Sequence, residues 1–360
     1  MPGLPGRGLE AAHEAGLAGA PAEHSAEHFI QRPKTPVERL HGLLHRYETG
    51  APMVVLVVAF IAFSLIADNF FLTGNVSLIL QQVMVIGTLA IAQSLVILTA
   101  GIDLSVGALM LLSSVVMGRL AVHAGLPTWL ALLGGLGVGT ACGFLNGVLV
   151  TRFRLPPFIA TLGTLSVFFA LGLYTSQSET IRAQDVEAEA SLLQWTANSF
   201  EVFGLRITAG VVLMVGLFAL VWYVLNWTAW GRHVYSVGND PVASRLVGIR
   251  TDRVLLSVYV IAGLICGIAG WLFIGRVGAV TSVGITDANL FSITAVVIGG
   301  ISLFGGRGSV LGALIGALIV GVFENGLRLA GLDVLWVQFS LGLLILAAVA
   351  MDHWIRKVTA

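Results

Sequence analysis

The chain has 360 residues, of which 57% are hydrophobic and only 11% are charged, and its mean hydropathy is +0.93. Soluble domains carry roughly a quarter charged residues, so this composition excludes an ordinary soluble protein. Several uncharged runs exceed the roughly 20 residues with which a helix crosses hydrocarbon. Because these runs are continuous and do not alternate in polarity, they exclude a β-barrel and predict an all-α polytopic membrane protein.

Residues 1–50 precede the first apolar run and contain five of the ten prolines of the chain. They lack the charged, apolar and cleavage regions that make up a signal peptide. Their composition predicts a disordered cytoplasmic tail, followed by a transmembrane domain over residues 51–355.

Ten apolar runs follow the tail, and each is expected to form one transmembrane helix. They cover roughly residues 51–70, 75–98, 102–122, 128–150, 157–175, 207–226, 254–274, 290–304, 309–328 and 334–354. The eighth run is short, so we expect it to be kinked or partly re-entrant.

The positive charges indicate which loops face the cytoplasm. With the N-terminus inside, the cytoplasmic segments carry 14 of the 19 Lys and Arg residues. The five others are Arg119, Arg182, Arg206, Arg276 and Arg328. Cytoplasmic loops of membrane proteins are enriched in Lys and Arg, so both termini are predicted to be cytoplasmic. The acidic segment 176–206 is then the longest external loop.

A weak internal repeat supports this count of helices. Residues 144–165 align without gaps with residues 323–344, and Asn146 is matched by Asn325. The two segments lie five runs apart and have opposite predicted orientations, so the repeat predicts two inverted five-helix halves. Transporters are commonly built from inverted repeats. Glycines at every fourth position, as at Gly139 and Gly143, predict closely packed helices.

The predicted inside loop 227–253 contains signals for a short helix. Asp240 is a good N-cap, Pro241 suits the first helical position, and Gly248 suits the left-handed residue beyond the end. A capped helix in a basic cytoplasmic loop favours a docking surface for a cytoplasmic partner. The alternative is a helix that lies on lipid headgroups.

Neutral polar residues inside the apolar runs are candidates for a polar translocation path, because such side chains tend to face the interior of a helix bundle. Each is equally able to make an interhelical hydrogen bond. The candidates are Gln81, Gln82, Gln93, Asn146, Asn325 and Gln338. Glu324 and Arg328 lie four residues apart in the ninth run, so an ion pair near its outer boundary is expected.

Asp103 is the only charged residue between Asn69 and Gly118. It is expected in the first turn of the third helix, where free backbone N–H groups favour a carboxylate and Ser105 can take part in capping. The alternative is a broken helix deeper in the bundle, with Asp103 and Ser105 beside the path of a solute.

The sequence contains no catalytic constellation. The phosphate-binding pattern GxxxxGK[ST] is absent, since the only lysines are Lys34 and Lys357, and no Cys, His and Asp cluster has metal-ligand spacing. The chain is therefore not expected to be an enzyme, to hydrolyse ATP or to bind a cofactor or metal.

Four motifs are distinctive: LTAGIDLSVGAL (98–109), LPPFIATLGTL (155–165), GRHVYSVGNDPVASRLVGI (231–249) and the glycine-rich run 293–327. In this order they resemble the permease subunits of bacterial ATP-binding-cassette importers for monosaccharides, the ribose, xylose and fructose group. The similarity covers about residues 50–355, and the segment before LTAGIDLS looks most like fructose-type permeases. Ala100 departs from the glycine that is frequent in the family, and Asn289 departs from a glutamate.

The resemblance implies a homodimer in the bacterial inner membrane, a cytoplasmic ATP-binding subunit that holds ATP and Mg, and a periplasmic sugar-binding protein. No nucleic-acid partner is expected. It also implies that the helix in the loop is a coupling helix that seats in the ATPase. The residues that match this helix are Asn239, Asp240, Pro241, Ala243, Arg245, Leu246 and Gly248.

Two other classes of function remain open at this point. A proton-coupled sugar transporter with Asp103 as proton carrier would need no ATPase, and an uncoupler would abolish its uptake while ATP was maintained. A channel or membrane-embedded enzyme is the other class. A channel would conduct as a purified protein without ATP, and an enzyme would need a cluster of catalytic groups.

Overall fold

The computed structural model of the protein describes residues 49–282 and 287–359. The tail predicted for residues 1–50 lies outside the described residues up to residue 48, and its disorder stays a prediction. Within the described part the chain is helical apart from one short β-hairpin.

Seven helices in the described part are long and apolar enough to cross a membrane. They are α3 (Thr73–Leu98), α4 with its terminal π-turn (Val106–His123), α5 (Thr128–Thr151), α6 (Pro157–Ser176), α9 (Ala209–Trp227), α12 (Thr251–Val277) and α14 (Val310–Leu329). Three shorter apolar helices are α2 (Gly50–Ile66), α13 (Ala288–Ile298) and the first part of α15 (Val334–Thr359). Each of the ten predicted runs contains one of these helices, which confirms an all-α polytopic membrane protein.

Four predicted boundaries differ from the structure by four residues or more. The first run is predicted to end at residue 70 but α2 ends at Ile66, and the tenth is predicted to end at residue 354 but α15 continues to Thr359. The third run is predicted from residue 102, but α4 begins at Val106 because the Asp103 carboxylate binds the backbone ahead of the helix. The eighth run is predicted to reach residue 304, but α13 ends at Ile298, before a turn in which Gly300 and Gly305 have positive φ. The inverted relation of the two halves stays a prediction.

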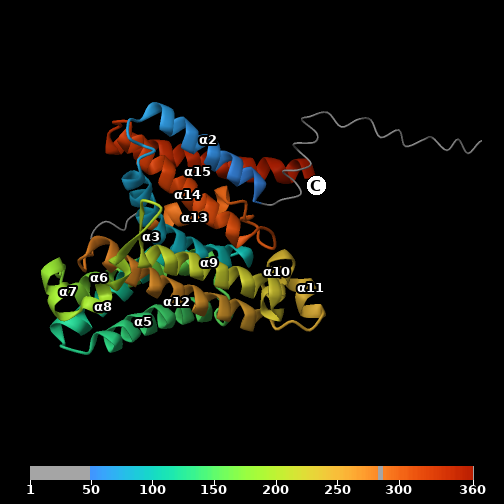
Figure 1. Cartoon of the computed structure of the whole chain (residues 1–360). Coiled ribbons are helices and arrows are strands. Elements are labelled where there is room, and N and C mark those ends of the chain that lie inside the picture. Colours follow the sequence, from blue (N-terminus) through green and yellow to red (C-terminus); the bar gives the residue numbers. More distant parts are fainter. Residues whose placement is uncertain (1–48, 283–286, 360) are drawn as a thin grey trace, which may run out of the picture. The chain divides into compact units, whose positions relative to one another are not determined.

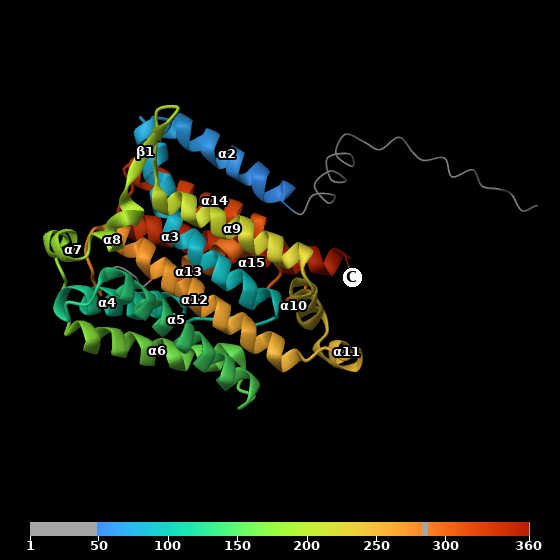
Figure 2. The ribbon, with the colours of Figure 1, turned by 60° about the horizontal axis from the view of Figure 1, so that its bottom comes forward.

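The connections lie at two ends of the helix bundle (Figures 1 and 2). One end carries α7 (Ala183–Glu189), α8 (Ser191–Gln194), a single 3-10 turn and the antiparallel strands β1 (Ser199–Val202) and β2 (Leu205–Thr208). The other end carries α10 (Ala229–Asn239) and α11 (Pro241–Leu246). We name them the hairpin end and the α11 end.

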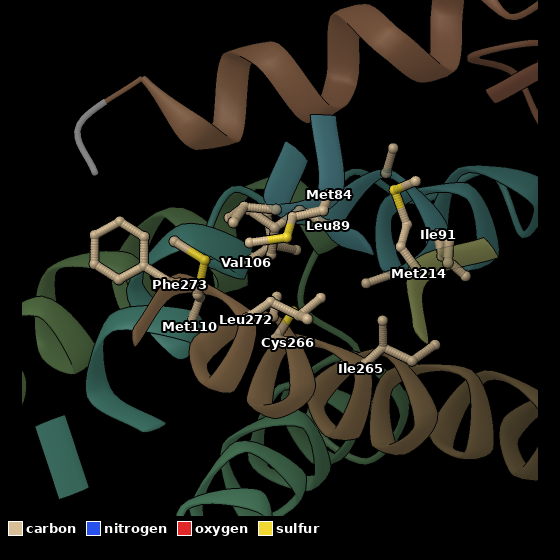
Figure 3. Packing of buried hydrophobic residues seen from close by; sticks show 14 of the residues in the cluster. Met84, Leu89, Ile91, Val106, Met110, Met214, Ile265, Cys266, Leu272 and Phe273 are labelled. Atoms are coloured by element: carbon tan, nitrogen blue, oxygen red, sulfur yellow. The ribbon is translucent and has the colours of Figure 1, made fainter. Parts of the chain in front are cut away.

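Helices α3 and α12 supply much of the packed interior. Figure 3 shows Met84 and Leu89 of α3 near Met110 of α4, with Cys266 and Leu272 of α12 beside them. All five side chains are buried. Lipid tails are as apolar as these side chains, so close van der Waals packing is what favours the assembled bundle.

The predicted close helix packing is confirmed between α5 and α12. A Cβ atom placed on Gly139 would lie 2.6 Å from the carbonyl oxygen of Gly263, and one placed on Gly143 would overlap the carbonyl oxygen of Tyr259. Only glycine allows the two backbones to approach this closely. The stripe therefore fixes α5 against the helix that leads to the α11 end.

Candidate functional site

The short helix predicted in the loop 227–253 is confirmed as α11. Asp240 is its N-cap, and one carboxylate oxygen accepts hydrogen bonds from Val242 N at 2.8 Å and Ala243 N at 2.9 Å. Pro241 occupies the first helical position, and Gly248 has a φ of 89° just beyond the end. These are the local signals that start and stop a helix, so α11 is encoded within its own sequence.

All the residues predicted to dock a partner are exposed at the α11 end: Asn239, Asp240, Pro241, Ala243, Arg245, Leu246 and Gly248. Large apolar side chains stand among them, with Leu246 84% and Val247 76% exposed. A cluster of exposed apolar side chains of this kind marks an interaction site, either for a protein or for the membrane surface. We name this cluster of exposed residues the α11 surface.

Arg245 is held within the chain. Its Nε donates to Thr251 Oγ1 at 2.6 Å, and its Nη2 contacts Asp252 Oδ1 at 2.9 Å. The buried Ser244 hydroxyl lies 2.8 Å from the Ser236 hydroxyl of α10. These contacts tie α11 to both α10 and the start of α12, so the α11 surface has a fixed orientation on the bundle.

The end of α10 packs directly on the connection between α3 and α4 and on the connection between α13 and α14. A Cβ on Gly238 would overlap the carbonyl oxygen of Leu98, the last residue of α3, and would lie 2.7 Å from Gly306 N. Gly306 N in turn donates to Leu98 O at 2.9 Å, and the Tyr235 hydroxyl donates to Gly308 O at 2.9 Å. We name these contacts the glycine junction. It joins α10 to the segment 99–105 and to the turn 299–309.

Asp103, Ser105 and Asn146, which were separate candidates in the sequence, come together just beyond this junction. One Asp103 carboxylate oxygen accepts from Ser105 N at 2.7 Å and from Ser105 Oγ at 2.6 Å. Asn146 Nδ2 donates to Ser105 Oγ at 2.8 Å, and all three side chains are buried. These hydrogen bonds fix the conformation of the chain immediately before α4. Asp103 is predicted in the first turn of this helix, but it precedes the helix, which begins at Val106.

Two unpartnered groups lie near these three residues. Neither Asn146 Oδ1 nor the hydroxyl of Tyr259 has a hydrogen-bond partner among the described residues. A Cβ on Gly101 would lie 3.1 Å from the Tyr259 hydroxyl oxygen, which places this hydroxyl beside the segment 99–105. Buried polar groups are nearly always paired, so these atoms are available to water or to a passing polar solute.

The other path candidates are spread over three helices, α3, α14 and α15. Gln93 lies in the last two turns of α3, and both of its polar side-chain atoms are buried without a partner among the described residues. Asn325 Oδ1 of α14 likewise has no partner in this part of the chain. Gln82 and Gln338 line a cavity at the hairpin end, whereas Gln81 contributes only its carbonyl oxygen, which accepts from Arg276 Nη1 at 2.7 Å. Their role in a path stays a prediction.

Helix α13 starts inside the bundle. Its 11 residues span about 16 Å, roughly half of the hydrocarbon thickness. Asn289, at its second position, accepts a hydrogen bond from Gly107 N of α4 at 2.6 Å. The residue that departs from the family's glutamate therefore caps the first turn of α4, and the N-terminus of α13 faces the interior at the hairpin end.

A cavity of about 270 Å³ lies at this N-terminus, between α3, α4, α12, α13, α14 and α15. We name it the hairpin-end cavity. Its apolar lining includes Phe273 and Phe291. Its polar lining consists of Gln82, Arg276, Asp287, Glu324, Arg328 and Gln338. Charged groups in a membrane bundle are expensive and usually mark a functional site, so the cavity is a second candidate site beside the α11 surface.

The polar groups of the cavity form local pairs. Glu324 and Arg328 form the ion pair expected from their spacing of four, at 2.8 Å, and Gln338 Nε2 lies 3.3 Å from Asp287 Oδ2. Sequence reasoning placed Glu324 and Arg328 only at a membrane boundary and did not find Arg276 or Asp287 as site residues. A signal for them exists, since Arg276 follows the seventh apolar run and Asp287 precedes the eighth, but it does not show that the ends of these runs converge.

An exposed capped helix, a membrane helix that starts inside the bundle and a polar cavity together suit a transporter. A family profile described as "Branched-chain amino acid transport system / permease component" matches residues 75–349. The chain belongs to this permease family.

Named relatives cover nearly the whole permease. It is 54% identical to the fructose import permease protein FrcC of Rhizobium meliloti over 333 residues, 92% of each chain. It is 34% identical to the ribose import permease protein RbsC of Bacillus subtilis strain 168, over 89% of the permease and 97% of that relative. It is 31% identical to the D-allose transport system permease protein AlsC of Escherichia coli strain K12, over 86% and 92%. The resemblance to monosaccharide permeases is confirmed.

Proposed function

We propose that the permease is the membrane subunit of an ATP-driven importer that carries a monosaccharide across the bacterial inner membrane, with fructose as the favoured substrate. The relatives named for fructose, ribose and allose import support a sugar substrate, and the highest of these identities is to a fructose permease. The observation that carries the coupling to an ATPase is the capped, exposed and rigidly held α11.

In this proposal the α11 end faces the cytoplasm and both termini lie there, as the positive charges indicate. The α11 surface receives the ATP-binding subunit, which holds ATP and Mg. The hairpin end receives the periplasmic sugar-binding protein, and a second copy of the permease completes a homodimer. The chain itself carries out transport without catalysing a reaction.

The glycine junction is the mechanical link in this proposal. Closure of the ATPases moves α11, and α10 moves with it because Ser236 and Ser244 are joined. At Gly238 the backbone of α10 contacts Leu98 and Gly306, so a movement of α10 displaces the α3–α4 and α13–α14 connections together. Packed interfaces switch between discrete arrangements and are not continuously deformable, so this displacement favours one of two states of the path.

The α11 surface is tested by Leu246→Asp, which places a charge on its most exposed apolar side chain. We expect the variant to reach the membrane, to lose co-purification with the ATP-binding subunit and to lose ATP-driven fructose uptake. The matched control is Phe203→Asp, a fully exposed aromatic residue of the hairpin turn, which should still bind the ATPase. Normal ATPase binding by Leu246→Asp would contradict the docking role.

A proton-coupled sugar transporter is the second candidate, supported by the buried carboxyl of Asp103. The two candidates differ in proteoliposomes. ATP-driven import by the complete complex continues when an uncoupler removes the proton gradient, whereas proton-coupled import stops. Uptake that follows the proton gradient in the absence of the ATPase would overturn the importer.

A further inference from the structure

We propose that the hairpin-end cavity is a monosaccharide-binding subsite within the permease itself, in which sugar hydroxyls bind between Gln82 of α3, Arg276 of α12 and Glu324 of α14. The inference deepens the proposed function and rests on it. The cavity would hold the sugar after its release at the hairpin end and before its passage beyond the start of α13.

The first support is an incomplete hydrogen-bond pattern. Gln82 lines the cavity, and its Oε1 is buried without any hydrogen-bond partner among the described residues. Buried acceptors are nearly always paired, so a group of this kind is normally completed by a ligand or by water. A sugar hydroxyl donates the hydrogen bond that Gln82 Oε1 lacks.

The second support is size. The volume of about 270 Å³ lies just below the roughly 300–1,000 Å³ of pockets that hold drug-sized ligands. A single sugar ring is smaller than such ligands, so the cavity has room for one monosaccharide.

The third support is the balance of the lining. A polyol needs both acceptors and donors, and the cavity offers the Glu324 and Asp287 carboxylates together with the Arg276 and Arg328 guanidinium groups. Arg328 is paired with Glu324, and one Arg276 nitrogen is bound to the Gln81 carbonyl. Guanidinium groups carry five N–H donors, so hydrogen-bonding capacity is left while the charges are balanced.

An amino acid is the competing ligand class, and the experiment below is designed to exclude it. Glu324 and Arg328 pair with each other, whereas Asp287 accepts from the neutral amide of Gln338 and Arg276 is bound to the Gln81 carbonyl. A zwitterion would use Arg276 for its carboxylate and Asp287 for its ammonium group. Phe273 and Phe291 complete the lining with apolar surface against which the C–H groups of a sugar ring pack.

An amide side chain outside the cavity provides the control. Gln82 lines the cavity, whereas Asn226 is an exposed amide near the end of α9 and is absent from the lining. The full-length permease in lipid nanodiscs is titrated with D-fructose and, separately, with L-leucine, and binding is followed by calorimetry. We expect fructose to bind, leucine not to bind, Gln82→Leu to weaken fructose binding at least about tenfold, and Asn226→Leu to leave it unchanged.

Glu324→Gln is the second variant, and it removes the negative charge while keeping the shape of the side chain. We expect it to weaken fructose binding as well, provided that its elution as a single species shows an intact fold. Fructose binding that is the same in wild type, Gln82→Leu and Glu324→Gln overturns the subsite. Binding of leucine in place of fructose overturns the assigned ligand class.

The failure of the subsite is distinguishable from the failure of the proposed function. In vesicles that contain the complete importer, wild-type ATP-driven fructose uptake tests the function. If the wild type imports fructose and both cavity variants do so with unchanged apparent KM, the importer stands and the subsite is wrong. If the complete wild-type complex imports no monosaccharide, the proposed function is wrong.

Discussion

The two ends of the bundle are built in opposite ways. At the α11 end, backbone lies on backbone at Gly238, Leu98 and Gly306, and even one methyl group has no room. At the hairpin end, six elements leave a cavity of about 270 Å³ with charged side chains around it. One end is filled without space for a solute, and the other holds space and hydrogen-bonding groups.

This difference indicates that the two ends of the bundle have different roles. A contact between backbones passes on a displacement without loss, because packed interiors have low compressibility. A cavity between separate helices, in contrast, changes its shape whenever any of them moves. The segment 99–105 lies between the two regions, since Leu98 ends at the glycine junction and Gly107 is bound by Asn289 of α13.

The largest effect is expected from Gly238→Ala. Alanine normally stabilises a helix relative to glycine, by about 1 kcal/mol. At Gly238 its methyl group would overlap the backbone carbonyl of Leu98, which cannot move aside unless the end of α3 shifts. We therefore expect a cost greater than about 1–3 kcal/mol, the range that is typical of overpacking. We expect a lower thermal unfolding midpoint in detergent and strongly reduced ATP-driven uptake.

Gly216→Ala is the control for this substitution. Gly216 lies in the interior of α9, and a Cβ there would meet nothing within 4 Å. This variant should unfold at the wild-type temperature or above it and transport normally. If Gly238→Ala behaved in the same way, the α11 end would not be tightly packed and the contrast between the two ends would fail.

A smaller effect is expected at Asp103, and it decides whether this residue belongs to the packed end or to the solute path. Its carboxylate oxygen accepts two hydrogen bonds from Ser105, and the amide oxygen of asparagine is able to accept both. Asp103→Asn should therefore cost less than about 1 kcal/mol of stability and retain uptake. Asp103→Ala leaves both donors unpaired and should cost about 1–3 kcal/mol.

The measurement is the denaturation midpoint of the purified protein, followed by ATP-driven uptake in vesicles. A well-folded Asp103→Asn variant that no longer transports would place the carboxylate on the path. In that case the buried residues Asp103, Ser105 and Asn146 would act on the solute, and the packed region would end at the glycine junction.

The sequence predicted what is encoded locally. Asp240, Pro241 and Gly248 specify α11 within nine residues of chain, and the spacing of Glu324 and Arg328 predicted their ion pair. The helices themselves followed from long apolar runs. Such features need no knowledge of the neighbours, because each depends on contacts within one or two helical turns.

The sequence did not predict what depends on distant contacts. The cavity requires the ends of several helices to converge, and a single charge at the end of an apolar run, such as Arg276, does not say which helix it will face. The glycine junction was missed for the same reason. Gly238 and Gly306 are separated by more than two helices in the chain, so no local pattern indicates that they touch.

The smallest effect is expected at Ala100, where the sequence departs from the glycine frequent in the family. Its φ is 60°, in the left-handed region, which costs an alanine about 1–2 kcal/mol. Ala100 is exposed, so removal of its methyl group loses little packing. Glycine loses about 0.5–1 kcal/mol more conformational entropy on folding than alanine does. This loss offsets part of the backbone strain that the substitution removes.

Ala100→Gly should therefore raise stability by up to about 1 kcal/mol, measured as a higher thermal midpoint in the same detergent. Ala108→Gly, inside α4, is the matched control and should lower stability by about 1 kcal/mol, because glycine is unfavourable within a helix. A loss of stability in Ala100→Gly would mean that the Ala100 methyl group contributes to the packing beside Leu98. The tightly packed region would then extend past the end of α3 toward Asp103.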